Sequence, residues 1–444
     1  MEARSREGWG TKAGFILAAV GSAVGLGNMW RFPYAAADRG GAAFVILYIL
    51  MVFLVGVPVM LSEFAVGRRA RLSPIGALRL VGGPNWATLG YLYVLTGCLI
   101  LAYYSVIAGW TVRYTLEAML SGFSSNPSEY FDHSATGIGA TLYHIAFMGI
   151  TISIVIGGIK GGIERASLVL MPMLFVLIVG LAIWAAFQPG AAEGYNFYLR
   201  PEPAKLLSAD TLAGAAGQAF FSLSLGMGAM LTYASYLSRD ENLPGSAATI
   251  SVADFGVAFL AGLVVFPVIF AFSLQGEISA SSLGTLFISL PTAFLKMGAA
   301  GRLVGLVFFM ALLVGALTSA ISLLEVVTSS LIDNWKLDRA RAALGAGLVI
   351  MLIGIPCAYS LDVLALYDKI AGEFLLVVGG LMLALFVGWR MSNPLDEVIN
   401  GFRSQGLAKA WLWTMRVAVP IVLAVVIYQV GGQAVDLIRS TLFN

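Results

Sequence analysis

Long apolar runs alternate with short polar segments along the whole chain. A bilayer core about 30 Å thick needs about 20 apolar residues per helix, so the pattern predicts about eleven membrane-spanning helices. With approximate ends, the predicted spans cover residues 13–36, 42–67, 86–120, 137–157, 165–188, 212–237, 246–274, 303–333, 342–359, 365–391 and 408–438. The predicted fold class is an all-α integral membrane protein with a single domain, residues 1–444.

Basic residues collect in alternate loops, which predicts the orientation of the chain. They are Arg4, Arg6, Lys12, Arg68, Arg69, Arg71, Arg79, Lys336, Arg339, Arg341, Arg390, Arg403 and Lys409. We therefore expect a cytoplasmic N-terminus and, because the number of spans is odd, a C-terminus outside a plasma membrane, with tails short enough to suggest a prokaryote. Two outer loops, about 189–211 and 275–302, are expected to hold short helices.

Composition supports a membrane protein and excludes several other classes. The chain is 59% hydrophobic and only 11% charged, and its net charge of +2 does not suggest a nucleic-acid partner. Two histidines, His133 and His144, are too few for a histidine-ligated metal centre. Cys98 and Cys357 lie in apolar runs, so we expect free thiols and no disulfide. No nucleophile elbow or acid–base dyad indicates an enzyme, and no organic cofactor or obligate protein partner is expected.

Two predicted spans are interrupted by glycine-rich polar segments, "GSAVGLGN" from Gly21 and "SLSLGMGAM" from Ser222. Unwound chain at membrane depth leaves helix ends there, which suit a carboxylate and small hard cations. The interruptions are five spans apart, so we expect two inverted repeats, about 13–188 and 212–391, and an additional helix, about 408–438. The alternative is that the glycines serve close helix packing or a kink.

Oxygen-bearing side chains lie in the same spans, at Asn28, Ser222, Asp254, Thr318 and Ser319. Oxygen donors are the ligands that hard cations prefer. A serine or threonine in a membrane helix is usually bonded to its own backbone, but a carboxylate there is costly and suggests function. Asp254 is therefore the strongest candidate, ahead of Glu63, Glu117 and Glu325.

Four segments resemble the signatures of the neurotransmitter:sodium symporters, in particular their prokaryotic amino-acid-transporting branch. They are "GSAVGLGNMWRFPYAAADRGGAAF", "GVPVMLSEFAVGR", "FFSLSLGMGAMLTYASY" and "ALTSA". The resemblance covers essentially the whole chain and implies alternating access, in which Na⁺ drives uptake of a substrate. A channel would need rings of equivalent residues. A sodium-independent antiporter of similar architecture would lack Asn28 and the Thr318–Ser319 pair.

The resemblance also implies roles for individual residues. The first sodium site would use Ala23, Asn28, Ser222 and Asp254, and the second Gly21, Val24, Gly315, Thr318 and Ser319. The substrate would contact Ala23, Gly25, Ser224, Leu225 and Gly226, with Tyr104 on its carboxylate, Phe221 as a lid, and Ile100, Met227, Ala320 and Leu323 around its side chain. Arg31 and Asp368 would form the outer gate, Arg6 and Asp333 the inner gate, Trp9 and Tyr236 its bracing, and Glu63 would bond unwound backbone. The alternative for Arg31 and Asp368 is a static ion pair, and for Arg6 and Asp333 it is a pair of surface charges. The alternative for Tyr104 is a phenol buried in the core.

Four departures from the family pattern bear on the substrate and on chloride. Gly25 replaces the aspartate of monoamine transporters, and Met227 stands where an aromatic residue often narrows the pocket. We therefore expect hydrophobic L-amino acids, from Leu, Ile, Val and Met up to Phe, Tyr and Trp. Asp254 stands where many relatives have Asn, and Ala258 where chloride-dependent ones have Ser. This predicts chloride-independent transport, with proton antiport if Asp254 protonates on the return step.

The stretch "GGIKGGIERASLVLMP" runs from Gly157 to Pro172 and leads into the fifth predicted span. A proline inside a helix removes one hydrogen bond and clashes with the preceding turn. We hypothesise that unwinding between Gly162 and Pro172 admits water to the second sodium site. The alternative is a loop followed by an ordinarily kinked helix.

Overall fold

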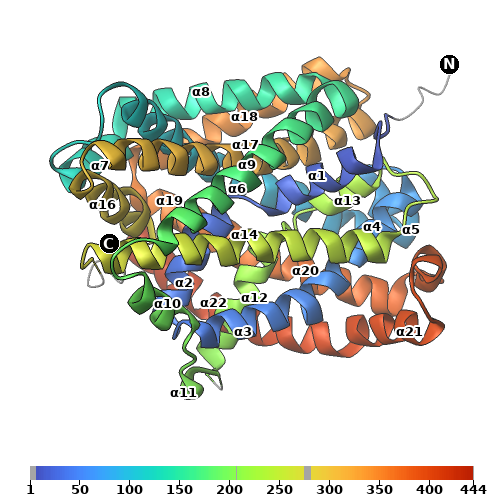
Figure 1. Cartoon of the computed structure of the whole chain (residues 1–444). Helices are drawn as coiled ribbons and strands as arrows, with labels where there is room; N and C mark the ends of the chain where they lie inside the picture. Colours follow the sequence, from blue (N-terminus) through green and yellow to red (C-terminus); the bar gives the residue numbers. More distant parts are fainter. Residues whose placement is uncertain (1–6, 207, 275–281, 444) are drawn as a thin grey trace.

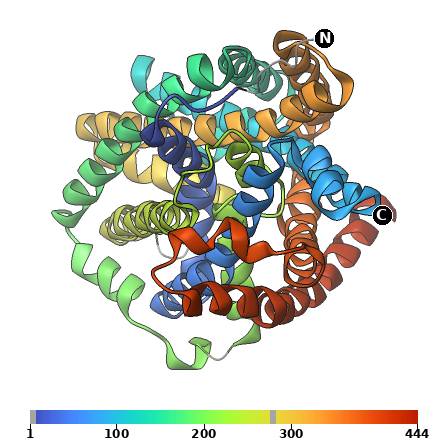
Figure 2. The ribbon, with the colours of Figure 1, turned by 90° about the vertical axis from the view of Figure 1, so that its right-hand side faces the viewer.

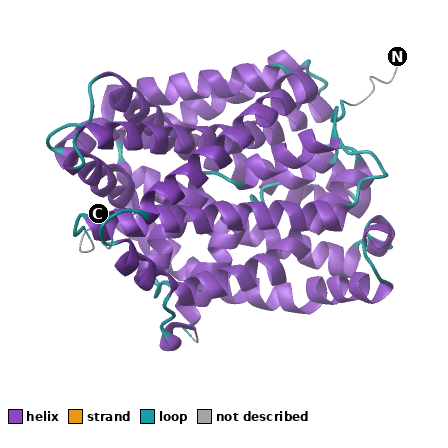
Figure 3. Ribbon diagram, viewed as in Figure 1, coloured by secondary structure: helices purple, strands orange, loops and turns teal. Residues whose placement is uncertain are grey.

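The computed structural model describes residues 7–206, 208–274 and 282–443. In this part of the chain, helices and loops account for the structure apart from one isolated bridge, Gly41 to Pro201 (Figure 3). Nine helices among the described residues are long and apolar enough to cross a membrane, and one further pair of helices qualifies as a span bent by 44°. Ten of the eleven predicted spans thus correspond to helices of sufficient apolar length, while the helices over the predicted span 212–237 do not meet that condition.

The first five predicted spans correspond to helices that run between the two ends of the bundle. They are α1 (Lys12–Ala23) with η1 (Gly27–Arg31) and α2 (Phe32–Asp38); α3 (Ala42–Met51), η2 (Val52–Gly56) and α4 (Val57–Ala70); η3 (Pro84–Trp86) and α6 (Ala87–Leu120); α8 (Gly137–Ile156); and η4 (Ile159–Glu164) with α9 (Arg165–Ala186). The fifth span thus begins in helical turns at Ile159, where the sequence suggested a loop.

The remaining spans follow the same plan, and the sixth is split. They are α12 (Ala209–Ser222) and α13 (Ala229–Ala234); α14 (Leu243–Ala271); α17 (Ala299–Trp335); α18 (Arg339–Tyr359); α19 (Leu361–Tyr367), η7 (Asp368–Leu375), α20 (Leu376–Leu385) and η8 (Phe386–Arg390); and α21 (Gln405–Trp413), η11 (Thr414–Ala418) and α22 (Val419–Phe443). With the split sixth span counted, each of the predicted spans has a helical counterpart.

Short helices lie at the two ends of the bundle (Figure 1). They are α5 (Pro74–Gly82), α7 (Pro127–Ala135), α10 (Ala191–Leu199), α11 (Pro203–Leu206), α15 (Ser282–Gly284), η6 (Thr285–Ser289), α16 (Leu290–Lys296), η9 (Pro394–Glu397) and η10 (Ile399–Gly401). Short helices thus lie in both predicted outer loops, although 275–281 fall outside the described residues. We name the two ends after α16 and α5; the chain starts at the α5 end and finishes at the α16 end.

The interrupted spans occupy the middle of the bundle, as the view in Figure 2 shows. There α1 packs against α9, α14 and α17, and α13 packs against α4 and α17. Side chains seal some of the helix ends. The Thr11 hydroxyl accepts from the Gly14 amide at the start of α1, and the Arg302 guanidinium donates to the last carbonyls of α6. Cys98 and Cys357 are free thiols.

Candidate functional site

Both glycine-rich segments are breaks in their helices. Helix α1 ends at Ala23, and Val24 has an extended backbone (φ −78°, ψ 107°) before η1 begins. In the sixth span the chain leaves helical geometry at Leu223 and resumes it at Ala229. Ser224, Gly226 and Gly228 in this break have positive φ angles of 53°, 75° and 76°. A Cβ on Gly226 would collide with the Leu376 carbonyl, so this turn needs glycine.

Buried side chains satisfy the backbone that the breaks expose. The fully buried Glu63 carboxylate accepts from the Gly226 amide at 2.9 Å and the Leu231 amide at 3.1 Å. Gln218 Nε2 donates to the Gly27 carbonyl at 2.8 Å. The Ser224 hydroxyl donates to the Ser22 carbonyl at 2.7 Å, which joins the two breaks directly. The bonds to Gly226, Leu231 and Ser22 stand in for bonds that an intact helix would make, as membrane depth requires, whereas the Gly27 carbonyl also accepts from the Phe32 amide.

An oxygen-rich cluster surrounds the fully buried carboxylate of Asp254. Asn28 Nδ2 donates to its Oδ1 at 2.7 Å, and the Ser222 hydroxyl donates to the same oxygen at 2.8 Å. The Tyr48 hydroxyl donates to Oδ2 at 3.0 Å. Ala23 ends α1 and is also buried. The four residues expected at the first sodium site thus lie at or beside the breaks, and a carboxylate, hydroxyl, amide and carbonyl suit a hard cation.

The second group of oxygen donors lies where α17 meets the first break. The Ser319 hydroxyl lies 3.3 Å from the Gly21 carbonyl, 3.2 Å from that of Ser22 and 3.5 Å from that of Val24. Ser319 therefore bonds across to another helix rather than along its own. Thr318 instead donates to carbonyls of its own helix, at 3.1 Å to Gly315, as serines and threonines in membrane helices usually do. The Ser319 hydroxyl thus lies near three carbonyls at the end of α1, whereas Thr318 and Gly315 bond each other within α17.

The residues expected around a substrate side chain are buried between α6, α17 and the second break. Tyr104 accepts a hydrogen bond from the Leu26 amide at 3.2 Å. A Cβ on Gly25 would stand 2.8 Å from the Tyr104 hydroxyl, so position 25 leaves no room for a side chain. The other expected contacts are also buried, at Ile100, Phe221, Leu225, Met227, Ala320 and Leu323. Apart from Ser224 and Tyr104, this lining is apolar or backbone.

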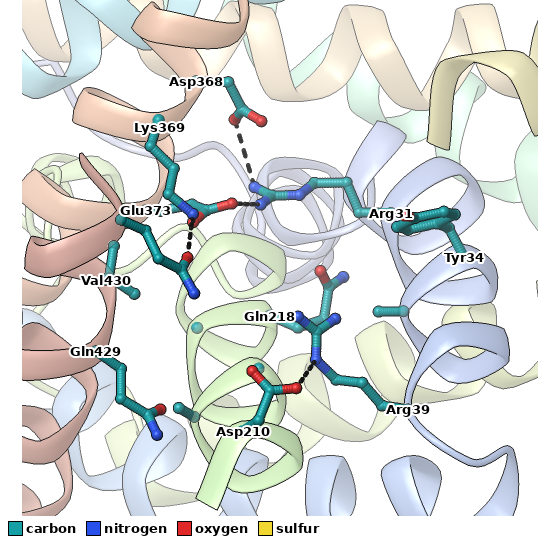
Figure 4. Close-up of a pocket in the computed structure, with 15 residues that line it drawn as sticks. Arg31, Tyr34, Arg39, Asp210, Gln218, Asp368, Lys369, Glu373, Gln429 and Val430 are labelled. Carbon is teal, nitrogen blue, oxygen red and sulfur yellow. Dashed lines mark hydrogen bonds and ion pairs between the residues drawn. The ribbon is translucent and has the colours of Figure 1, made fainter. Parts of the chain in front are cut away.

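At the α16 end, a cavity of about 210 Å³ leads to Arg31 (Figure 4). The Arg31 guanidinium lies 3.5 Å from an Asp368 oxygen and 2.8 Å from a Glu373 oxygen. Its Cζ stands 4.5 Å from the centre of the Phe221 ring. The expected pair with Asp368 is therefore present, but Glu373, which the sequence pattern did not indicate, is nearer.

The α5 end is closed by aromatic and charged side chains. The Trp9 ring packs edge-on against Tyr236 at 6.5 Å, and its indole N–H donates to the Tyr233 carbonyl at 3.0 Å. The Tyr236 hydroxyl donates to the fully buried Glu325 at 2.6 Å, and Arg339 pairs with the same carboxylate at 2.8 Å. Glu325 was a candidate from the sequence alone, which does not indicate these partners.

The expected inner gate pair is only partly within the described residues. Asp333 accepts from the Ser73 amide at 2.6 Å, which ties α17 to the start of α5. Arg6 lies outside the described residues.

The segment from Gly162 to Pro172 is helical throughout. Glu164 within it is buried and accepts from the Gly10 amide at 2.6 Å and the Thr11 hydroxyl at 2.8 Å. Pro172 is accommodated inside α9. The structure thus shows this segment in its helical state, and its unwinding stays a prediction.

A helical membrane bundle whose two broken spans meet at a buried, oxygen-rich centre defines a secondary transporter. The chain belongs to the sodium:neurotransmitter symporter family, whose model matches residues 6–127 and 131–434. Family membership confirms the predicted transporter class, and it confirms that the protein is not an enzyme. It also establishes a multi-pass membrane protein that uses Na⁺.

Individual relatives agree with this assignment. Uncharacterized sodium-dependent transporters of Methanocaldococcus jannaschii and Bacillus subtilis are each 35% identical to the chain, cover 96% of it and are themselves covered to 91% and 97%. The serotonin transporter of Drosophila melanogaster is 29% identical over 86% of this chain and 68% of its own. A crystal structure of MhsT in complex with L-phenylalanine is 37% identical, with a TM-score of 0.88 over 96% of this chain and 100% of MhsT. The all-α membrane fold is thereby confirmed.

Proposed function

We propose that the chain is a sodium-coupled symporter of hydrophobic L-amino acids that works by alternating access. The observation that carries the proposal is the meeting of the two breaks beside the buried Asp254 carboxylate. Cations at the oxygen clusters and a zwitterion between the helix ends would neutralise one another at a depth where unpaired charge is costly. The family supports the use of Na⁺, while two sodium sites are part of the proposal.

The apolar lining supports the choice of substrate. A side chain between Ile100, Met227 and Leu323 would meet no charged group, whereas the Tyr104 hydroxyl would offer a donor to a carboxylate. Methionine adapts its shape, so Met227 suits residues from leucine to tryptophan. MhsT was crystallised with L-phenylalanine, and a bovine relative, 28% identical over 60% of this chain and 41% of its own, is named as a neutral amino acid transporter.

Sodium-dependent binding tests the proposal most directly. Radiolabelled leucine and tryptophan would be added to the purified protein in Na⁺ and then in K⁺. We expect saturable binding in Na⁺ alone, with each amino acid displacing the other. Equal binding in both salts would instead indicate the sodium-independent antiporter.

We also propose that transport needs no chloride. The Tyr48 and Ser222 hydroxyls already have an anion to bond to, the Asp254 carboxylate. Replacing chloride by gluconate should leave uptake unchanged, and a sharp fall in uptake would contradict the proposal. Proton antiport would follow if Asp254 takes up a proton on the return step.

The gates and the orientation complete the proposal. The α16 end would face outside, with Arg31 in the outer gate, and the α5 end would face the cytoplasm. Asp333 and Arg6 would form the inner gate, braced by Trp9 and Tyr236. The repeats, 13–188 and 212–391, would supply one break each, with 408–438 as the additional helix. Accessibility of single cysteines at the two ends to a membrane-impermeant reagent in intact cells would test the orientation.

A further inference from the structure

Arg31 faces two carboxylates, and the nearer is not the one that the family pattern indicates. We propose that Glu373 is the principal carboxylate of the outer gate, and that Lys369 competes with Arg31 for it and so promotes opening. This inference rests on the proposed function, because only that proposal makes the α16 end the outer side. The contacts themselves do not depend on the substrate. Asp368 then serves to orient the gate.

The helix around the gate explains how Glu373 reaches Arg31. Asp368 is the first residue of η7, a π-helix of 8 residues, and Glu373 lies two residues before its end. Residues five apart are joined by the hydrogen bonds of a π-helix and share a face, whereas in an α-helix they point about 140° apart. The π-helix therefore presents both carboxylates to Arg31. Their side chains are 20% and 27% exposed, and that of Arg31 is 17% exposed, so the pair with Glu373 is partly shielded from water.

Asp368 is already held by another partner. The Tyr103 hydroxyl on α6 donates to Asp368 Oδ1 at 2.8 Å, the same oxygen that stands 3.5 Å from Arg31. A Cβ on Gly372 would lie 2.6 Å from the Tyr103 hydroxyl, so glycine leaves room for that bond. The shorter contact of Arg31 is the one to Glu373 Oε1, at 2.8 Å.

Lys369 occupies the other oxygen of Glu373. Its Nζ lies 2.6 Å from Glu373 Oε2 and 2.6 Å from the side-chain oxygen of Gln433 on α22. When Arg31 withdraws, Glu373 keeps Lys369 as its cation and Asp368 keeps the hydrogen bond from Tyr103. Loss of Lys369 would remove that compensation and tighten the pair with Arg31. Because Arg31 stacks on Phe221, its withdrawal would also free the ring above the breaks.

The test measures gate opening without any substrate. Spin labels would be placed at two exposed residues of the α16 end, Asp38→Cys on α2 and Asp362→Cys on α19, in a full chain carrying Cys98→Ala and Cys357→Ala. Distance distributions from pulsed electron paramagnetic resonance in Na⁺ then give the ratio of open to closed molecules. Elution as a single species would verify that each variant folds.

The two central variants are expected to shift that ratio in opposite directions. Glu373→Gln should raise it about three- to tenfold, and Lys369→Gln should lower it by a similar factor. In the double variant, Lys369→Gln should add nothing to Glu373→Gln. The matched control Asp368→Asn should shift the ratio less than Glu373→Gln.

Two results would overturn the inference. If Asp368→Asn opens the gate and Glu373→Gln does not, Asp368 is the gate carboxylate. If both Glu373→Gln and Lys369→Gln open it, Lys369 merely stabilises the closed state. Amino-acid binding by the unmodified chain is measured separately, so failure of the proposed function shows there and failure of the gate inference shows in the distances.

Discussion

Replacing Asp254 by asparagine removes the charge at the centre of the proposed sodium site with little change in shape. The carboxylate accepts from Asn28 at 2.7 Å, Ser222 at 2.8 Å and Tyr48 at 3.0 Å, and it is fully buried. The amide of Asp254→Asn can accept through one oxygen only. The change therefore separates the charge from the packing.

The expected loss follows from the electrostatics of a buried site. Two unit charges about 4 Å apart attract by about 4 kcal/mol at an effective dielectric constant near 20. Removing the carboxylate also removes its own desolvation penalty, which offsets part of that attraction. A net loss of about 2–3 kcal/mol corresponds to a sodium affinity about 30- to 140-fold weaker.

The same change should create a need for chloride. In Asp254→Asn the Tyr48 and Ser222 hydroxyls lose their anionic acceptor and become free to bond an external anion. Uptake into proteoliposomes would be measured against Na⁺ concentration, in chloride and in gluconate. We expect chloride to restore much of the lost affinity. A variant that keeps normal sodium affinity, or that ignores chloride, would refute this account of Asp254.

Two further substitutions and one exchange measurement test other parts of the protein. Met227→Phe should weaken tryptophan binding by about tenfold or more while leucine binding stays within about threefold, with Met227→Leu as the matched control; equal effects on both amino acids would contradict the assigned pocket. Glu63→Gln should lower the stability by about 2 kcal/mol and impair binding, because one of the Gly226 and Leu231 amides loses its acceptor; an unchanged Tm would argue against it. Hydrogen exchange across 162–172 should be faster in K⁺ than in Na⁺, and identical exchange would count against unwinding there.

Much of the architecture could be predicted because its causes are local. Apolar length gives the spans, and glycine clusters in apolar runs give the breaks. The partners across the bundle could not be predicted in this way. Tyr48 and Gln218 lie in spans where a tyrosine or an amide reads as an ordinary core residue, yet they bond Asp254 and Gly27. Only their registers relative to other helices, which a single sequence does not contain, distinguish them.

Glu373 escaped prediction for a different reason. On an ideal α-helix Glu373 points away from Asp368, and the sequence does not predict the π-helical turns that bring the two carboxylates together. The pairing of Glu325 with Arg339, 14 residues on, likewise depends on how α17 and α18 meet. Charge placement along a helix can thus be predicted only as well as the helix geometry itself.

The α5 end has a feature that ties two predicted events together. Glu164 accepts from the Gly10 amide and the Thr11 hydroxyl, while Glu7 accepts from the Ile159 amide at 2.7 Å. Each segment thus supplies the carboxylate that satisfies the other's backbone at a helix start. Unwinding after Gly162 would carry Glu164 with it and leave Gly10 and Thr11, just before α1, without this acceptor. Water entry beside the fifth span and release of the first helix would therefore be coupled, because both would break the bonds that these two carboxylates make.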